Sequence, residues 1–210
     1  MTSYSERTHT FLSIFFTIAY FIIGAASTLF FECPKHIDPA NNRGKKKLSY
    51  YDYYSNYPMI FYATAATIFS AYVVAKEGLT FGQPNSKDVE FILCHGFGYF
   101  LYDLVYGTYR GYLDRETKIH HVVAIVMSVL GLYLRNSGNE FAFLILAEEI
   151  SNPIAGLRKI LKCYKMESSM LFYYVSLILG FIYTVARFII GPIYAIWFYP
   201  GPTHLGIKIS

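Results

Sequence analysis

The most informative stretch of the sequence runs from residue 98 to residue 123 and reads GYFLYDLVYGTYRGYLDRETKIHHVV. An apolar segment carries one carboxylate, Asp103. A charged turn at residues 110–118 follows, and a second apolar segment then opens on His120 and His121. Ionisable side chains are costly to bury in apolar membrane helices, so they usually mark a functional site. These three residues are therefore the first candidates for a polar pocket.

The composition around this stretch is that of a membrane protein. The chain is 54% hydrophobic and only 15% charged, whereas a soluble domain has about 25% charged residues. Its apolar blocks approach the roughly 20 residues that a membrane-spanning helix needs. The sequence predicts an all-α, polytopic bundle of about six transmembrane helices, forming one domain over residues 1–210.

We expect the apolar segments at residues 11–31, 59–75, 91–109, 119–134, 140–157 and 168–199. The last segment is interrupted by Arg187 and by Pro192, and the proline should end or kink the helix because it lacks a backbone donor. Residues 32–57 are expected to form a polar loop that ends in a cluster of interfacial tyrosines.

Lysine and arginine gather in the loops after the first, third and fifth segments. Those loops hold twelve of them, against four on the other side. The positive-inside rule places the basic loops in the cytosol, or in the matrix of a mitochondrion, and the N-terminus on the opposite side. In this setting the run Lys45, Lys46 and Lys47, together with Arg158 and Lys159, is expected to contact anionic headgroups rather than nucleic acid.

This topology brings Asp103 and the two histidines into the same leaflet. Asp103 lies about seven residues before the inner loop, roughly 10 Å into the membrane at 1.5 Å per residue. Adjacent helical residues point about 100° apart, so only one histidine can face Asp103 directly. Tyr99 and Tyr106 share the face of Asp103 by their i−4 and i+3 spacing.

Further polar residues lie in the later segments. Glu148 and Asn152 share one helical face by their spacing. Arg187 should pair with an acidic residue or extend to the outer headgroups. His95 should pack in the core or face a polar cavity. The three cysteines do not form a disulfide framework.

Three interpretations of the polar residues stay open from the residues alone. Asp103 and the histidines can be structural. They can instead form the polar floor of a lipid or acyl-chain pocket, in which a histidine acts as general base for a hydroxyl or amine that attacks an acyl thioester. A metal site is disfavoured, because the six histidines include no H-x-x-H-H cluster. No metal or cofactor is expected.

Four motifs together resemble the TLC-domain family, which includes ceramide synthases and non-synthase membrane proteins. They are GYFLYD at 98–103, KIHHVV at 118–123, LAEEISNPIAGLR at 146–158 and TVARF at 184–188. The resemblance covers residues 91–192 and implies a helical bundle around a lipid-accessible cavity. It places Asp103, His120 and His121 at that cavity. The segment with Glu148, Ser151, Asn152, Pro153 and Arg158 is similar to the non-synthase branch.

The chain departs from the synthase pattern in three places. Residues 147–151 read AEEIS where ceramide synthases carry H-D-x-x-D, and residues 55–58 lack the arginine and histidine usual in the second span. The family also usually continues through another membrane helix after the equivalent of residue 210. These departures favour a non-catalytic, lipid-binding protein that is an accessory or structural subunit of a larger membrane complex.

The alternative is a lipid N- or O-acyltransferase that takes acyl-CoA as co-substrate, with the His120/His121 pair as base and Asp103 orienting it. In either interpretation the partners are membrane lipids and other membrane subunits, not nucleic acid. The expected location is the endoplasmic reticulum or the mitochondrial inner membrane. The expected lipid-cavity residues are Tyr99, Tyr106, Glu148, Ser151, Asn152 and Arg187.

Overall fold

The computed structural model describes residues 4–37, 50–78 and 82–198. Its helices in chain order are α1 (Tyr4–Phe30), α2 (Tyr50–Glu77), α3 (Lys87–Arg110), α4 (Arg115–Leu134), α5 (Gly138–Glu149), α6 (Asn152–Cys163), α7 (Met170–Thr184), the π-helix η1 (Val185–Ile190) and α8 (Gly191–Phe198). The described part of the chain contains no strand beyond an isolated bridge between Pro84 and Asn136. The predicted all-α class is therefore confirmed.

Local signals fix the turn between α3 and α4. The α3 helix ends at Gly111, which adopts a left-handed conformation with φ 75°, a conformation that glycine adopts at little cost. Four residues later α4 begins, with Asp114 as its N-cap accepting a hydrogen bond from the backbone N–H of Thr117 at 2.7 Å. The turn is short, so the end of α3 and the start of α4 must lie side by side.

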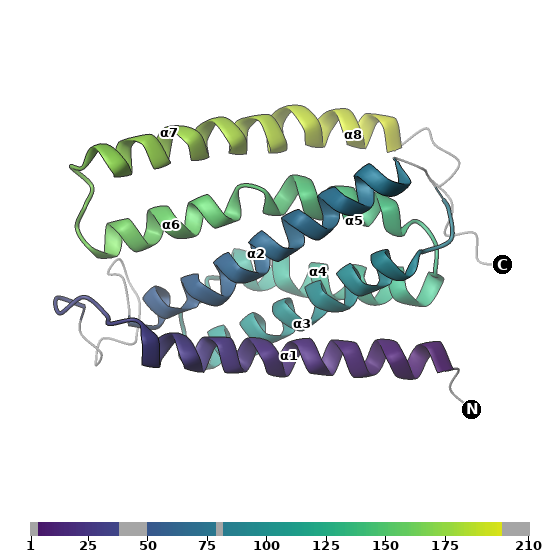
Figure 1. Ribbon diagram of the computed structural model, residues 1–210, viewed down its shortest axis with the longest axis horizontal. Helices are drawn as coiled ribbons and strands as arrows, with labels where there is room; N and C mark the ends of the chain where they lie inside the picture. The colour runs from purple at the N-terminus through teal and green to yellow at the C-terminus, as the bar shows by residue number, and fades with distance from the viewer. Residues whose placement is uncertain (1–3, 38–49, 79–81, 199–210) are drawn as a thin grey trace.

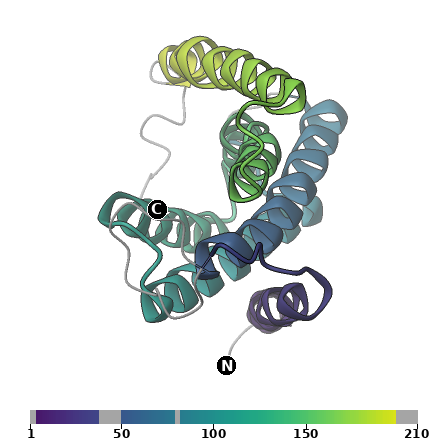
Figure 2. The same ribbon diagram turned by 90° about the vertical axis from the view of Figure 1, so that its left-hand side faces the viewer.

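The α2 helix lies at the centre of the bundle and packs against α1, α3, α5 and α6. The α1, α3 and α4 helices lie on one side of it, and α7 covers α6 on the other (Figures 1 and 2). Where α1, α2 and α3 meet, the core is aromatic, with Tyr20, Tyr62, Tyr99, Phe100 and Tyr102 all buried. Ring packing thus contributes to holding these three helices together.

Within the described residues, four helical segments are long and apolar enough to cross a membrane. They are Arg7–Phe30, Tyr50–Glu77, Arg115–Leu134 and Met170–Ile193. The chain is therefore a multi-pass membrane protein, but the count of six spans is not confirmed. The α3 helix has 24 residues, enough to span at 1.5 Å per residue, but its ends are charged. The fifth segment consists of two short helices.

Two expected boundaries were wrong, and at a third position, Pro192, the helix continues after a local distortion. The α2 helix begins at Tyr50, so the expected loop tyrosines form its first two turns and Pro58 lies inside it. The segment at 140–157 is not one helix, because the chain breaks at Ile150 and Ser151 between α5 and α6. Pro192 does not end the last helix: the preceding turn widens into η1, where the N–H of Gly191 donates to the carbonyl of Ala186.

The three loops expected on one side of the membrane do lie at one end of the bundle. The Tyr53 hydroxyl contacts the Glu32 carbonyl after α1 and the Tyr164 hydroxyl after α6, at 3.1 and 3.0 Å. Arg110, at the end of α3, donates to the Tyr51 hydroxyl at the start of α2. Lys45, Lys46 and Lys47 lie outside the described residues.

Candidate functional site

Asp103 and His121 form a buried pair between α3 and α4. The Oδ2 atom of Asp103 and the Nε2 atom of His121 are 2.6 Å apart, and the two residues are 6% and 5% exposed. The other carboxylate oxygen of Asp103 accepts a hydrogen bond from the Tyr112 hydroxyl at 2.7 Å. Both oxygens of the buried carboxylate are thus satisfied, as burial of a charged group requires.

Tyr112 lies in the turn that joins α3 and α4, and its burial raises the pKa of its phenol well above the usual range. It therefore remains protonated and keeps donating to Asp103 at every physiological pH. In the same turn, hydrogen bonds from Thr117 hold the pKa of the N-cap Asp114 below its usual value. The turn is thus tied to both helices at the point where the buried pair sits.

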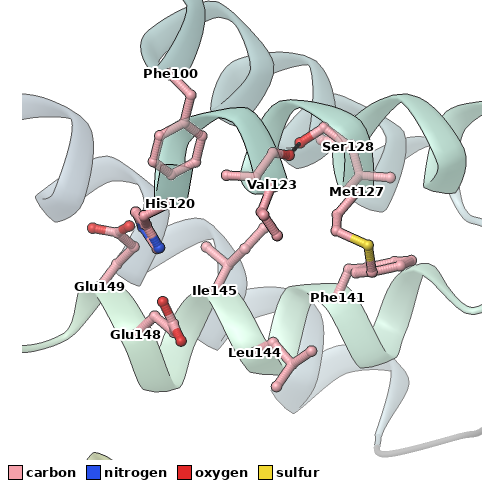
Figure 3. Close-up of a pocket in the computed structure, with 12 residues that line it drawn as sticks. Phe100, His120, Val123, Met127, Ser128, Phe141, Leu144, Ile145, Glu148 and Glu149 are labelled. Carbon is pink, nitrogen blue, oxygen red and sulfur yellow. Dashed lines mark hydrogen bonds between the residues drawn. The ribbon is translucent and has the colours of Figure 1, made fainter. Parts of the chain in front are cut away.

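The second histidine has a different environment. His120 is exposed, and its ring lies near those of Phe100 and His121, with centroids 5.9 and 5.7 Å away. As the helical spacing predicts, only one histidine of the pair faces Asp103. His120 instead projects towards α5, where Glu148 and Glu149 end the helix (Figure 3).

A cavity of about 690 Å³, here called the polar cavity, opens beside the buried pair. Its walls come from the starts of α2 and α4, the end of α3, the α3–α4 turn, α6 and η1. The ionisable residues among its lining are Asp52, Asp103, Tyr99, Tyr112, Asp114, His120, His121, Glu149, Arg158, Lys159, Lys162 and Arg187. Such a mixed charged lining suits a polar or charged group rather than an acyl chain.

A second hollow, here called the apolar groove, runs between α4 and α5 and has a volume of about 230 Å³. It is lined by Leu93, Phe100, His120, Val123, Ala124, Met127, Ser128, Phe141, Leu144, Ile145, Glu148 and Glu149. In Figure 3, the polar residues His120, Glu148 and Glu149 gather at one end, and Met127 and Phe141 lie at the other. Phe100, His120 and Glu149 line both the groove and the polar cavity.

The break between α5 and α6 shapes the junction of the two hollows. Pro153 lies in the first turn of α6 and has no N–H to continue the helix from Glu149. The carbonyl of Glu148 accepts a hydrogen bond from Arg187 of η1 at 2.9 Å, and the two side chains lie 3.8 Å apart. Arg187 therefore satisfies a helix-end carbonyl and pairs with an acid, as the sequence suggested.

The expected lipid-cavity residues divide between several places. Tyr99, Asn152 and Arg187 line the polar cavity, and Glu148 lines the apolar groove. Tyr106 lies outside both linings and packs on Tyr102 and Tyr112.

The shared face predicted for Glu148 and Asn152 was wrong, because the helix breaks between them. Ser151, at the break, is fully buried. Of the expected headgroup contacts, Arg158 and Lys159 both line the polar cavity.

Sequence reasoning missed Glu149, the buried acid at the junction. It is 4% exposed and accepts a hydrogen bond from the Asn152 side chain at 2.7 Å. Its neighbour Glu148 has a side chain that is 45% exposed. Pro153 was the signal that could have located it. A proline there predicts the start of a new helix, so helical spacing does not continue from the preceding residues into that helix. Tyr112 and Lys162 were also missed, since neither lies in an apolar segment.

Two further expectations concern residues away from the junction. His95 packs in the core against Phe16 and Tyr62 and hydrogen-bonds the Tyr20 hydroxyl. The three cysteines are free. Within the described ranges, no group of three or more histidine, cysteine or acidic side chains is placed to hold a metal ion.

The fold and the paired hollows define a multi-pass membrane protein with an amphipathic internal site. The sequence matches the TLC domain over residues 55–201, more than half of the chain, so the chain belongs to the TLC domain family. That family points to a lipid-related membrane protein. No solved structure matches the chain.

Proposed function

We propose that this protein is a non-catalytic lipid-binding protein whose site holds the polar part of a lipid in the polar cavity and one acyl chain in the apolar groove. One observation carries the proposal: Phe100, His120 and Glu149 line both hollows, so a polar chamber and an apolar channel meet at one point. An amphipathic lipid has the same division into a polar and an apolar part. Apolar pockets with a few convergent polar groups are typical of ligand sites.

The burial of His121 supports the non-catalytic assignment. Its Nε2 is hydrogen-bonded to Asp103, and its Nδ1 is buried with no hydrogen-bond partner in the described part of the chain. A general base must reach the proton that it abstracts, directly or through one water. With one nitrogen bonded and the other enclosed, His121 is better suited to anchoring α4 on α3.

The test is acyl-chain cross-linking in lipid nanodiscs with a photoactivatable phosphatidylcholine. The wild-type protein should yield adducts in α4 and α5. Met127→Trp and Leu144→Trp should remove most of these adducts, because both side chains line the groove and are 38% and 39% exposed. The matched control is Val129→Trp, on α4 but outside the groove lining and 47% exposed. Equal adduct yield in all variants would contradict the proposal.

A second candidate is a lipid acyltransferase that uses acyl-CoA. It is favoured by His120, whose exposed ring stands where the polar cavity and the groove meet, the place where an acyl carbonyl of a bound lipid would lie. His121, oriented by Asp103, would support it. Incubation with acyl-CoA and a long-chain base or lysolipid decides between the two. Turnover that disappears in His120→Ala or His121→Ala would overturn the non-catalytic proposal.

The proposal includes partner subunits and an orientation. Its support is the departure from the synthase pattern at residues 147–151 and the gathering of basic residues at one end of the bundle. On this proposal the polar cavity faces the cytosol or the matrix, in the endoplasmic reticulum or the mitochondrial inner membrane, with the N-terminus on the other side. Co-purification in fixed stoichiometry with other membrane proteins would support the subunit role. A protein that purifies alone after gentle solubilisation would count against it.

A further inference from the structure

The charged residues of the polar cavity are unevenly engaged. Its acids already have partners within the chain. Asp103 is bonded to His121 and Tyr112, Asp114 caps α4, and Glu149 accepts from Asn152. Asp52 also interacts within the chain. Such hydrogen bonds favour the charged form of a carboxylate and take up acceptor sites that the ammonium group of a ligand would otherwise use.

The basic residues of the cavity have more unused hydrogen-bond donors. Lys159 and Lys162 line it from the exposed side of α6, and within the described residues neither side chain forms a hydrogen bond or an ion pair. Arg158 is held through its Nε, which donates to the Ser176 hydroxyl at 2.9 Å, and its guanidinium stacks on Phe172 at 4.7 Å. A guanidinium fixed at Nε still has its two terminal amino groups as donors.

These three cations come from one helix. Arg158 and Lys162 are four residues apart and so share a face of α6, and Lys159 lies next to them on the same wall of the cavity. One fixed guanidinium beside two flexible ammonium groups is a donor set suited to a phosphate, which has several charged acceptor oxygens. On the opposite wall, Thr117 and the exposed ring of His120 line the cavity.

We propose that the Arg158, Lys159 and Lys162 wall of the polar cavity binds the phosphate of a net-anionic phospholipid headgroup. This inference rests on the proposed function, because the adjoining apolar groove makes the ligand an amphiphile rather than a free phosphate. A zwitterionic headgroup would need an uncommitted carboxylate for its amine, and the acids of the cavity are engaged. Selectivity for anionic over zwitterionic lipid follows.

The experiment measures binding of short-chain phosphatidic acid and phosphatidylcholine to the full chain in detergent. In the double variant Lys159→Gln with Lys162→Gln, phosphatidic acid should bind about tenfold more weakly or worse, because two charged donors are lost. Phosphatidylcholine binding should change little. The matched control is Arg115→Gln with Lys118→Gln, which removes the same charge at the same end of the bundle but outside the cavity lining.

Three results would overturn the inference. The first is an equal loss in both double variants, which would show general surface electrostatics. The second is inorganic phosphate binding as tightly as phosphatidic acid and unaffected by Met127→Trp, which would show a site for soluble phosphate. The third is equal affinity of the wild type for both lipids.

Failure of the proposed function gives a separate signal. Photoactivatable phosphatidic acid and phosphatidylcholine would then both yield no groove adducts, even in the wild type. If those adducts form while the lysine variant keeps its affinity for phosphatidic acid, the lipid site stands and only the phosphate assignment is wrong.

Discussion

At the scale of single residues, two adjacent histidines have opposite environments. His121 is 5% exposed and bonded to Asp103, whereas His120 is exposed at the junction of the two hollows. The 100° step between neighbouring helical residues makes this division unavoidable once α4 packs on α3. His121 therefore stabilises the helix pair, and His120 is the histidine that a bound molecule would meet.

This division predicts a difference in stability. Asp103→Ala removes the acceptor of two buried groups, the Tyr112 hydroxyl and the His121 ring. Each unsatisfied group costs about 1–3 kcal/mol, so the two together cost about 2–6 kcal/mol. At about 2–4 °C per kcal/mol for a chain of this size, thermal unfolding in detergent, followed by circular dichroism, should occur roughly 4–24 °C lower. His120→Ala is the control and should change the free energy of unfolding by less than about 0.5 kcal/mol. Equal unfolding temperatures would show that Asp103 does not anchor the two helices.

At the scale of elements, the break between α5 and α6 determines the shape of the site. It turns Glu149 inward and leaves the carbonyl of Glu148 to Arg187. The π-helix η1 holds Arg187 opposite the break, and such widened turns are frequent at functional sites. The break between α5 and α6, here called the elbow, and the π-helix η1 thus form one wall of the polar cavity together.

Arg187→Met tests this arrangement. Removal of the guanidinium leaves the Glu148 carbonyl without its donor, at a cost of about 1–3 kcal/mol. We expect hydrogen–deuterium exchange of the peptide covering residues 146–156 to become about five- to a hundredfold faster, since the elbow opens more often. Arg115→Met, at the exposed start of α4, is the control and should leave that peptide unchanged. Unchanged exchange in Arg187→Met would show that the elbow holds without its donor.

At the scale of the whole molecule, the bundle has a polar end and an apolar body. The polar cavity is lined by the starts of α2 and α4 and by the turn between α3 and α4. The ends of α1, α3 and α6 lie at this end of the bundle, and the turn between α4 and α5 lies at the other (Figure 1). The cytosolic face of a bilayer is anionic and attracts basic segments, so it fixes the orientation of such a molecule in the membrane. The polar cavity should then open towards the side on which anionic lipids and soluble partners gather.

The orientation is testable with cysteine labelling in sealed membranes, after the native cysteines are replaced by alanine. Tyr164→Cys, between α6 and α7, should react with an impermeant maleimide only from the cytosolic or matrix side. Asn136→Cys, between α4 and α5, should react only from the opposite side. The two positions control for each other, and the reverse pattern would place the N-terminus and the α4–α5 turn on the cytosolic or matrix side.

The amino-acid sequence alone was enough to predict an all-α membrane protein and to propose residues for its site. Apolar length and low charge require membrane helices, because unpaired backbone groups are not tolerated in lipid. Spacing along single helices was enough to show that one histidine would face Asp103. The family motifs at residues 98–123 and 146–158 contain many of the residues that line the polar cavity and the apolar groove.

The contacts between polar groups of distant segments could not be predicted from the sequence. The spacing rule failed for Glu148 and Asn152, because the helix breaks between them at Ile150 and Ser151, just before Pro153. The contact of Arg187 with the Glu148 carbonyl joins residues 39 apart in the chain. The meeting of the polar cavity and the apolar groove at His120 and Glu149 depends on the packing of α3, α4, α5 and α6 together. Such contacts are set by how whole helices pack, which no local pattern of residues encodes.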